Sequence, residues 1–319
     1  MGSQKLLEVE NLCIRYGALT AVSSVSFSVS NKEVVGLVGE SGAGKSATAK
    51  GIIGLLPPIA RMSGSVRYRG EELVGASRAR LQKARGAQIG YIFQDALTAL
   101  DPVRTVGVQL VEALRVHKPV SKREAWQASE ALLEELKIRD PRRVMNSYAH
   151  ELSGGMRQRA IIALALIAEP EVIIADEVTS ALDVTVQRKV LEILLRVCSD
   201  RGAGLIMITH DLGVVAQTCD RVIVLYGGIV AEDADVYTLF DHPRHPYTHA
   251  LMRSMPRVGS DAPFEPIPGS AIQVFGELQM CPFHERCAKA GPDCSAKLPP
   301  VQTYGGSQFR CFHPVGLEQ

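Results

Sequence analysis

The chain has 319 residues, of which 46% are hydrophobic and 22% charged, and its formal net charge is +1. This length allows one large core with an appendage, and the small net charge excludes an electrostatic case for nucleic acid as the main partner. The longest apolar run, Ala160–Ala168, reaches about half a membrane span, and Met1–Glu10 lacks the apolar core of a secretion signal. We therefore expect a cytosolic chain that does not cross a bilayer.

The first predicted elements are strands. Val25, Phe27 and Val29 alternate with serines, which is typical of a half-buried antiparallel strand. Together with Leu7–Ile14, this strand would form a small antiparallel β-subdomain that presents Tyr16.

A phosphate-binding loop is predicted next, between the apolar strand Val34–Val38 and a helical segment, Ala47–Leu56. Its sequence fits the P-loop spacing, in which glycines let backbone N–H groups surround phosphate oxygens and a lysine adds a mobile charge. The serine after the lysine can place its hydroxyl on Mg²⁺. The loop consists of Gly39, Glu40, Ser41, Gly42, Ala43, Gly44, Lys45 and Ser46. The alternative, a chance glycine turn, is weakened by the matching strand and helix.

Helical periodicity begins after Gln94, which follows the apolar run Ile89–Phe93. Ser121 and Glu124 form a predicted capping box that opens the helix over Ala125–Ile138. We expect a helical subdomain over about residues 97–165.

Within and after this insertion come an anion site, a strand that ends in two carboxylates and a strand that leads to a histidine. Ser153, Gly154 and Gly155 open a helix whose N–H groups have little side-chain cover, so they can meet an anion. The strand Glu171–Glu177 ends in two carboxylates, suited to Mg²⁺ coordination by Asp176 and to general-base work by Glu177. An apolar strand from Gly204 leads to His210; a lone histidine is usually structural, but this position favours a phosphate sensor.

The order of these motifs resembles the ATP-binding subunit of an ABC transporter, a P-loop NTPase of the α/β class, and the resemblance covers nearly the whole chain. It implies that Tyr16 stacks on adenine and that Glu177 is the general base, with His210 as the switch histidine. It also implies that the P-loop binds the phosphates of ATP. The resemblance further implies that Mg²⁺ is arranged by Ser46, Gln94 and Asp176. The residues implied to act across a dimer are Ser153, Gly154, Gly155 and Asp183, the last of which closes the stretch Ser180–Asp183.

Two positions depart from the family pattern. Val178 stands where the family usually has proline after the glutamate, and Ala47 stands where many members have threonine. Because proline fixes φ and removes a donor, Val178 loosens one constraint on the turn behind Glu177. We expect altered turnover rather than loss.

The composition changes after residue 240. The stretch Asp241–Thr248 resembles the His-Pro-Tyr element that opens the C-terminal region of ATPases in the dipeptide, oligopeptide and nickel importer group, and its histidines are interpreted as structural. The prediction is therefore an ATPase domain over residues 1–240 and an importer-type extension over residues 241–319. Residues Met255–Gly269 contain several prolines and predict a linker.

Four of the seven cysteines crowd into this extension: Cys281, Cys287, Cys294 and Cys311. A cytosolic location argues against disulfides, and the spacings lack the Cys-x-x-Cys pairs of structural zinc sites. Four thiolates could hold a [4Fe–4S] cluster, and some members of the resembling group carry one here. Zn²⁺, with His284 or His313 as a further ligand, is the alternative.

The resemblance implies an ATPase that drives import of peptides or similar small solutes from the cytoplasmic face of the inner membrane. Its partners would be a second, non-identical ABC ATPase subunit, two transmembrane permeases and an extracytoplasmic binding protein. The alternatives are a soluble ABC ATPase acting on DNA or ribosomes and, more distantly, a P-loop kinase, which needs neither the Ser-Gly-Gly helix nor a dimer. The substrate stays open among dipeptides, longer peptides, nickel chelates and opine-like compounds.

Overall fold

The computed structural model describes residues 4–94, 99–178, 183–254 and 266–317. These residues form two compact units, which we describe separately. The first unit contains Val29–Lys32, Gly75–Met207 and the N-terminal residues up to Leu6. The second contains Leu7–Ser28, Glu33–Val74 and the chain from Ile208 onward.

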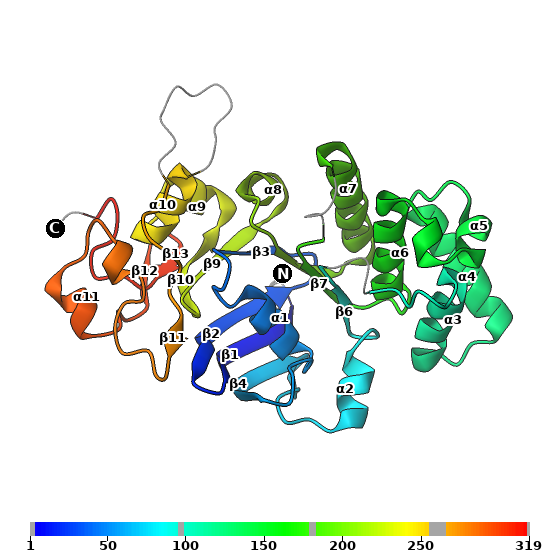
Figure 1. The fold of residues 1–319 in the computed structure, drawn as a ribbon, viewed down its shortest axis with the longest axis horizontal. Coiled ribbons are helices and arrows are strands. Elements are labelled where there is room, and N and C mark those ends of the chain that lie inside the picture. The colour runs from blue at the N-terminus through cyan, green and yellow to red at the C-terminus, as the bar shows by residue number, and fades with distance from the viewer. Residues whose placement is uncertain (1–3, 95–98, 179–182, 255–265, 318–319) are drawn as a thin grey trace. The chain divides into compact units, whose positions relative to one another are not determined.

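The first unit combines a group of helices with parallel strands (Figure 1). Its strands are β6 (Ile89–Ile92), β7 (Val172–Asp176) and β8 (Gly204–Ile208), of which β6 and β7 pair in parallel. Its helices are α2 (Arg78–Ala84), α3 (Val106–His117), α4 (Lys122–Glu135), α5 (Pro141–Asn146), η1 (Ala149–Glu151), α6 (Gly154–Leu166) and α7 (Val184–Arg201).

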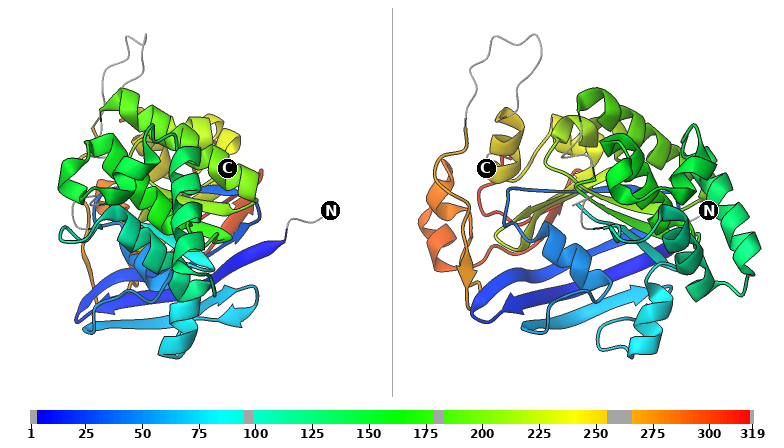
Figure 2. Two further views of the ribbon diagram at one scale, coloured as in Figure 1. Left: turned by 90° about the vertical axis from the view of Figure 1, so that its right-hand side faces the viewer. Right: turned by 45° about the vertical axis from the view of Figure 1, so that its right-hand side comes forward.

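The helices α3 to α6 pack against one another, and Figure 2 shows them in green as one group. The predicted capping box is confirmed, because Ser121 accepts from the Glu124 N–H and the Glu124 carboxylate accepts from the Ser121 N–H. The helix it opens is α4, whose Leu132 and Leu133 are buried. The helical character predicted after Gln94 is therefore present, although residues 95–98 lie outside the described residues.

The second unit contains an antiparallel sheet of order β11-β2-β1-β4-β5. The bounds are β1 (Lys5–Tyr16), β2 (Leu19–Ser30), β4 (Ala60–Tyr68), β5 (Glu71–Glu72) and β11 (Val274–Phe275). Val25, Phe27 and Val29 are buried, as their alternation predicts. Tyr16 is the last residue of β1, so the predicted β-subdomain does place it at a strand end.

A run of strands in the order β12-β13-β10-β9-β3 forms the other sheet part of this unit. Its bounds are β3 (Val34–Val38), β9 (Arg221–Tyr226), β10 (Ile229–Asp235), β12 (Gln302–Tyr304) and β13 (Ser307–Phe309). The helices of this unit are α1 (Lys45–Ile52), α8 (Leu212–Thr218), α9 (Val236–Asp241), α10 (Pro246–Arg253), η2 (His284–Arg286) and α11 (Pro292–Ala296). β3 pairs in parallel with β9, and β10 pairs antiparallel with both β9 and β13.

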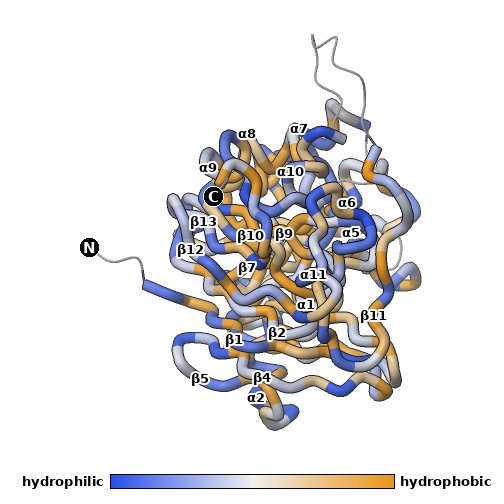
Figure 3. Tube along the Cα trace, turned by 90° about the vertical axis from the view of Figure 1, so that its left-hand side faces the viewer, coloured by the Kyte–Doolittle hydropathy of each residue, from blue (hydrophilic) through white to orange (hydrophobic). Residues whose placement is uncertain are grey.

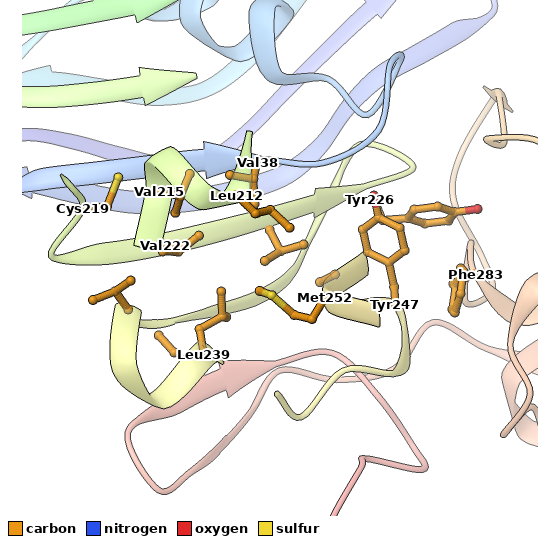
Figure 4. Packing of buried hydrophobic residues seen from close by; sticks show 14 of the residues in the cluster. Val38, Leu212, Val215, Cys219, Val222, Tyr226, Leu239, Tyr247, Met252 and Phe283 are labelled. Carbon is orange, nitrogen blue, oxygen red and sulfur yellow. The ribbon is translucent and has the colours of Figure 1, made fainter. Parts of the chain in front are cut away.

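The C-terminal residues share the core of this unit. Val222 and Val224 of β9 belong to one buried cluster with Tyr247 of α10 and with Phe283 and Cys281 (Figure 4). Hydrophobic residues colour much of β9 and β10 in Figure 3. Described residues beyond 240 are therefore anchored by apolar burial against β9 and against Val38, the last residue of β3, which leads into the phosphate loop.

No helix in the described part of the chain is long and apolar enough to span a membrane.

Candidate functional site

The phosphate loop begins where β3 ends and leads directly into α1. Gly39 has φ +146°, and a Cβ there would lie 2.2 Å from the Leu225 carbonyl oxygen. Gly44 has φ +101°, and its Cβ would lie 2.4 Å from the Ala21 carbonyl oxygen. Both positions therefore require glycine, because a side chain would be strained and would collide with backbone.

Lys45 is the first residue of α1, and its side chain is buried back under the loop. Its Nζ donates to the Gly39 carbonyl at 2.8 Å and to the Glu40 carbonyl at 3.0 Å. Ser41 and Gly42 are exposed at the tip, whereas Ala43 is buried and Ser46 half-buried. The ammonium group thus lies inside a loop whose tip is open to solvent, as an anion site requires.

Gln94 and the two carboxylates at the end of β7, Asp176 within the strand and Glu177 just after it, belong to the first unit. The Gln94 amide donates to Glu177 Oε2 at 2.7 Å, and the Tyr91 hydroxyl donates to Asp176 Oδ2 at 2.6 Å. Asp176 is buried and Glu177 half-buried. Burial, followed by the Asp176 bond, raises the pKa of Tyr91, so Tyr91 stays a hydrogen-bond donor to that carboxylate.

Sequence reasoning brought Gln94 and Glu177 into one site but missed Tyr91. Tyr91 is one of the apolar-looking residues of β6, and the parallel register sets Tyr91 opposite Ile174, two residues before Asp176. This contact depends on strand pairing, which leaves no local signal in the sequence.

Glu177 has a backbone φ of +47°, in the left-handed region that a residue with a Cβ enters at a cost. Such strain tends to occur at functional positions, where the surrounding fold enforces it. Val178, which follows, is buried. The side chain that replaces the family's proline therefore packs inside the fold directly behind the strained residue.

The Ser-Gly-Gly motif forms the start of α6 as predicted. Ser153 is the N-cap, and its hydroxyl accepts from the Met156 N–H at 3.4 Å. Ser153 and Gly154 are exposed, and a Cβ on Gly155 would lie 3.0 Å from Val186 of α7. The free N–H groups of this helix end are thus open to an external anion.

Asp183 caps α7 beside this helix end, accepting from the Thr185 and Val186 N–H groups at 3.1 and 3.0 Å. A cavity of about 820 Å³ is lined by Ser153, Gly154, Gly155 and Asp183, together with the basic residues Lys137, Arg139, Arg143 and Arg159 and the acidic residues Asp140 and Glu151. The four residues predicted to act across a dimer are therefore brought together in one cavity lined by charged residues of both signs. Ser180, Ala181 and Leu182 lie outside the described residues.

His210 lies two residues beyond the end of β8 and is exposed. Asp211, the next residue, caps α8 by accepting from the Gly213 and Val214 N–H groups at 2.9 and 3.1 Å. Tyr16, the phosphate loop and His210 belong to the second unit, whereas Gln94, Asp176, Glu177, Ser153–Gly155 and Asp183 belong to the first.

The four C-terminal thiols lie near enough to influence one another. Burial raises the pKa of Cys311 to about 12, and the other three thiols contribute further. Burial likewise raises the pKa of Cys281 to about 11, with contributions from Cys294 and Cys287. Backbone N–H groups point at the sulfurs: Lys289 donates to Cys287 Sγ at 3.4 Å, and His313 donates to Cys311 Sγ at 3.3 Å.

The four neighbouring thiols, with backbone N–H donors beside the sulfurs, fit a metal ion or a metal cluster whose positive charge would stabilise thiolates. In the absence of such a charge, burial would keep the thiols protonated. A second donor set overlaps this one, because Asp293, Cys294 and His313 have ligand atoms within 4.8 Å of one another. His313 Nε2 lies 2.8 Å from Asp293 Oδ1. His284, the other predicted zinc ligand, has its Nδ1 2.8 Å from the Cys281 carbonyl oxygen.

The His-Pro-Tyr element forms the start of α10. His245 is buried, and its Nδ1 accepts from the Tyr247 N–H at 3.0 Å as the helix N-cap. The backbone N–H of His245 donates to the buried carboxylate of Glu232 at 2.8 Å. His245 is therefore structural, as predicted.

Two family models match the chain. The one described as "ABC transporter" matches residues 22–180, and the one described as "Oligopeptide/dipeptide transporter, C-terminal region" matches residues 231–294. The probable peptide ABC transporter ATP-binding protein y4tR of Sinorhizobium fredii is 46% identical over 88% of this chain and 84% of its own length. This chain belongs to the ABC transporter ATP-binding family.

Other members of the family agree with this assignment. The oligopeptide transport ATP-binding protein OppD of Salmonella typhimurium is 42% identical over 97% of this chain and 94% of its own. The dimeric ATP-binding cassette MJ0796, solved in a post-hydrolysis state with ADP and Pi, has a TM-score of 0.65 and 26% identity, covering 72% of this chain and 99% of that one. The predicted ABC cassette fold of the α/β class is thereby confirmed.

Proposed function

We propose that this ABC ATPase subunit hydrolyses ATP to drive the import of peptides or similar small solutes through partner permeases. The observation that carries the substrate class is the match of residues 231–294 to the oligopeptide/dipeptide transporter C-terminal region. The relatives named above are peptide and oligopeptide transporter subunits, which favours import over a soluble ATPase acting on DNA or ribosomes.

Each site residue is proposed to take the part that its motif has in the family. Lys45 and the loop N–H groups would hold the phosphates, and Ser46, Gln94 and Asp176 would arrange Mg²⁺. Two observations within single units support this: Lys45 lies inside a glycine-dependent loop, and Gln94 is hydrogen-bonded to Glu177. Tyr16 would stack on adenine, and His210 would sense the γ-phosphate.

Glu177 is proposed as the general base that accepts a proton from the attacking water. Its carboxylate is half-buried, is oriented by Gln94 and stands on a strained backbone, so its direction is set before substrate arrives. Tyr91 keeps the neighbouring Asp176 carboxylate oriented.

Ser153, Gly154 and Gly155 are proposed to contact the γ-phosphate of an ATP held by a second ATPase subunit, with Asp183 communicating across the dimer. Support comes from the exposed helix end, the cavity that it opens on and the dimeric state of the cassette MJ0796. The remaining proposed partners are two permeases and an extracytoplasmic binding protein, which place this chain peripherally on the cytoplasmic face of the inner membrane.

For the cysteine group we propose a [4Fe–4S] cluster held by Cys281, Cys287, Cys294 and Cys311. When bound, it would supply the positive charge that keeps four thiolates together, and its part would be structural or redox-sensing. The N–H groups of Lys289 and His313 would stabilise the sulfurs. Zn²⁺ with His313 is the competing occupant, supported by the adjacent Asp293, Cys294 and His313.

The test of the importer assignment is purification of the tagged chain from membranes, followed by identification of co-purified chains and a peptide uptake assay. Recovery of permease chains and loss of uptake on deletion are expected. Recovery of ribosomes or DNA in place of permeases would contradict the proposal.

The occupant of the cysteine group is decided by metal analysis of the same anaerobic sample. About four iron and four acid-labile sulfides per chain are expected for the cluster. Stoichiometric zinc without iron would establish the alternative.

A further inference from the structure

Arg286 connects the cysteine-bearing segment to the phosphate loop within the second unit. Its Nη1 donates to Glu40 Oε2 at 2.6 Å and its Nη2 to Glu40 Oε1 at 2.9 Å, a two-pronged pair. The Arg286 side chain is 8% exposed and that of Glu40 is 25% exposed. Arg286 immediately precedes Cys287, and Glu40 is the second residue of the loop.

The rest of the Arg286 guanidinium is also held. Nε donates to the Pro268 carbonyl at 2.6 Å, and Nη1 donates to the Tyr226 hydroxyl at 3.0 Å. The guanidinium carbon lies 5.7 Å from the centre of the Tyr226 ring and 5.9 Å from that of Phe283. A planar group fixed on several sides can orient a carboxylate more strictly than a flexible ammonium could.

Glu40 is held at its backbone as well. Its N–H donates to the Tyr247 hydroxyl at 2.9 Å, and Tyr247 is fully buried. The Tyr247 ring packs against Tyr226 and Phe283, with ring centres 4.5 and 5.3 Å apart, as Figure 4 shows. The tyrosine of the His-Pro-Tyr element thus reaches the phosphate loop directly.

The third polar group of Glu40, its carbonyl oxygen, accepts from Lys45 Nζ at 3.0 Å. One residue therefore has its N–H on Tyr247, its carboxylate on Arg286 and its carbonyl on the loop lysine. A change in the position of Glu40 would move the carbonyl against which the lysine rests. An unpaired Glu40 carboxylate would in addition place a negative charge in a loop that receives phosphates.

We propose that Arg286 is a positioning residue for nucleotide binding. It neutralises and orients Glu40, and Tyr247 fixes the Glu40 backbone, so that the C-terminal extension sets the phosphate affinity of the loop. Arg286 acts through Glu40 and not on the nucleotide itself. This inference rests on the proposed role of the phosphate loop in holding ATP.

The experiment measures the Kd of the full chain for MgADP by calorimetry. Arg286→Met should weaken binding by about tenfold, and Arg286→Lys, which retains the charge but not the fork, should weaken it less. Glu40→Gln combined with Arg286→Met should restore most of the affinity, because it removes the uncompensated charge. The matched control is Arg244→Met, since Arg244 also belongs to the C-terminal region but donates to the Val315 and Gly316 carbonyls.

If Arg286 had a purely structural role, Arg286→Met would lower the melting temperature but leave the Kd for MgADP unchanged. Adding Glu40→Gln would then have no loss of affinity to restore. The inference would be overturned by an unchanged Kd in Arg286→Met. It would also be overturned if the double variant lost as much affinity for MgADP as the sum of the losses in the two single variants. If the parent chain itself binds no MgADP, the proposed function fails instead.

A conservative second pair of variants covers the case in which Arg286→Met does not fold. Tyr247→Phe removes the hydroxyl that accepts from Glu40 and should weaken MgADP binding several-fold, whereas Tyr237→Phe should not, because Tyr237 is 78% exposed. Equal affinity in both variants would count against the positioning role.

Discussion

Glu177 combines a left-handed backbone, at φ +47°, with a carboxylate that accepts from Gln94. The residue pairs an uncommon main-chain conformation with a fixed side-chain direction, and both depend on the fold around it. A general base needs this kind of orientation, because proton transfer falls off sharply with misplacement.

Glu177→Gln should keep ATP binding but lower steady-state hydrolysis by about a hundredfold or more, because the amide cannot accept the proton. ATP-bound closed dimers should accumulate, and size-exclusion chromatography with ATP would detect them. Glu192→Gln, on the surface of α7, is the control. Hydrolysis at the parent rate in Glu177→Gln would remove the general-base assignment.

Val178→Pro tests the turn behind Glu177. Proline would remove one N–H and fix φ at a position where valine is buried. We expect the steady-state ATPase rate to change by several-fold while MgADP affinity stays the same. An unchanged rate would show that this departure from the family is neutral.

His245 gives a residue-level prediction about pH. Burial lowers its pKa from 6.5 to about 4, so the folded chain resists a proton that the unfolded chain takes up. Stability is therefore fully present above about pH 6.5 and is lost as the pH falls toward 4, by roughly 3 kcal/mol at most. The free energy of unfolding, measured with urea between pH 4 and 7, should change less with pH in His245→Asn than in the parent. His242→Asn, at an exposed position, should show the same pH dependence as the parent.

At the scale of elements, the two helix ends that are predicted to bind anions have different surroundings. At the α1 end the Lys45 ammonium lies inside the phosphate loop, whereas the α6 end is exposed and opens on a cavity. The difference follows from the residue at each start, because the Lys45 side chain folds back inside the loop, whereas the Ser153 hydroxyl accepts from the Met156 N–H of its own helix. The exposed α6 end is thus compatible with its proposed contact with an ATP held by another subunit.

Ser153→Arg should accordingly separate binding from turnover. A bulky cation at the N-cap blocks the helix end and loses the cap, so ATP hydrolysis by the assembled transporter should fall by at least about a hundredfold. The Kd of the isolated chain for MgADP should stay at the parent value, whereas Lys45→Ala should abolish that binding. Weak MgADP binding in Ser153→Arg would mean that this serine serves the chain's own site.

At the scale of the whole chain, the region beyond residue 240 is built into the core that supports the phosphate loop. β13 pairs with β10, Arg244 and His245 donate N–H groups to the buried Glu232, and Phe283 packs on the tyrosines beneath Glu40. A region that carries grouped cysteines therefore shares apolar burial and hydrogen bonds with nucleotide-binding elements.

The sequence alone determined which functional motifs occur and in what order they follow along the chain. Glycine spacing, paired carboxylates after an apolar run and a capping box act over a few residues, so Gly39–Ser46, Asp176, Glu177 and the start of α4 could be predicted from local pattern. The helix after the phosphate loop was predicted over Ala47–Leu56, yet α1 spans Lys45–Ile52, because helix ends depend on packing and capping more than on propensity.

Tertiary structure alone decided which distant residues meet. Tyr91 reaches Asp176 through strand register, and Arg286 reaches Glu40 across most of the chain. Neither contact has a sequence signal, because a hydrogen bond between remote residues depends on how buried strands and rings pack and not on their neighbours in the chain. Local chemistry thus specified the parts of the phosphate site, and packing of the C-terminal region specified what holds Glu40 in place.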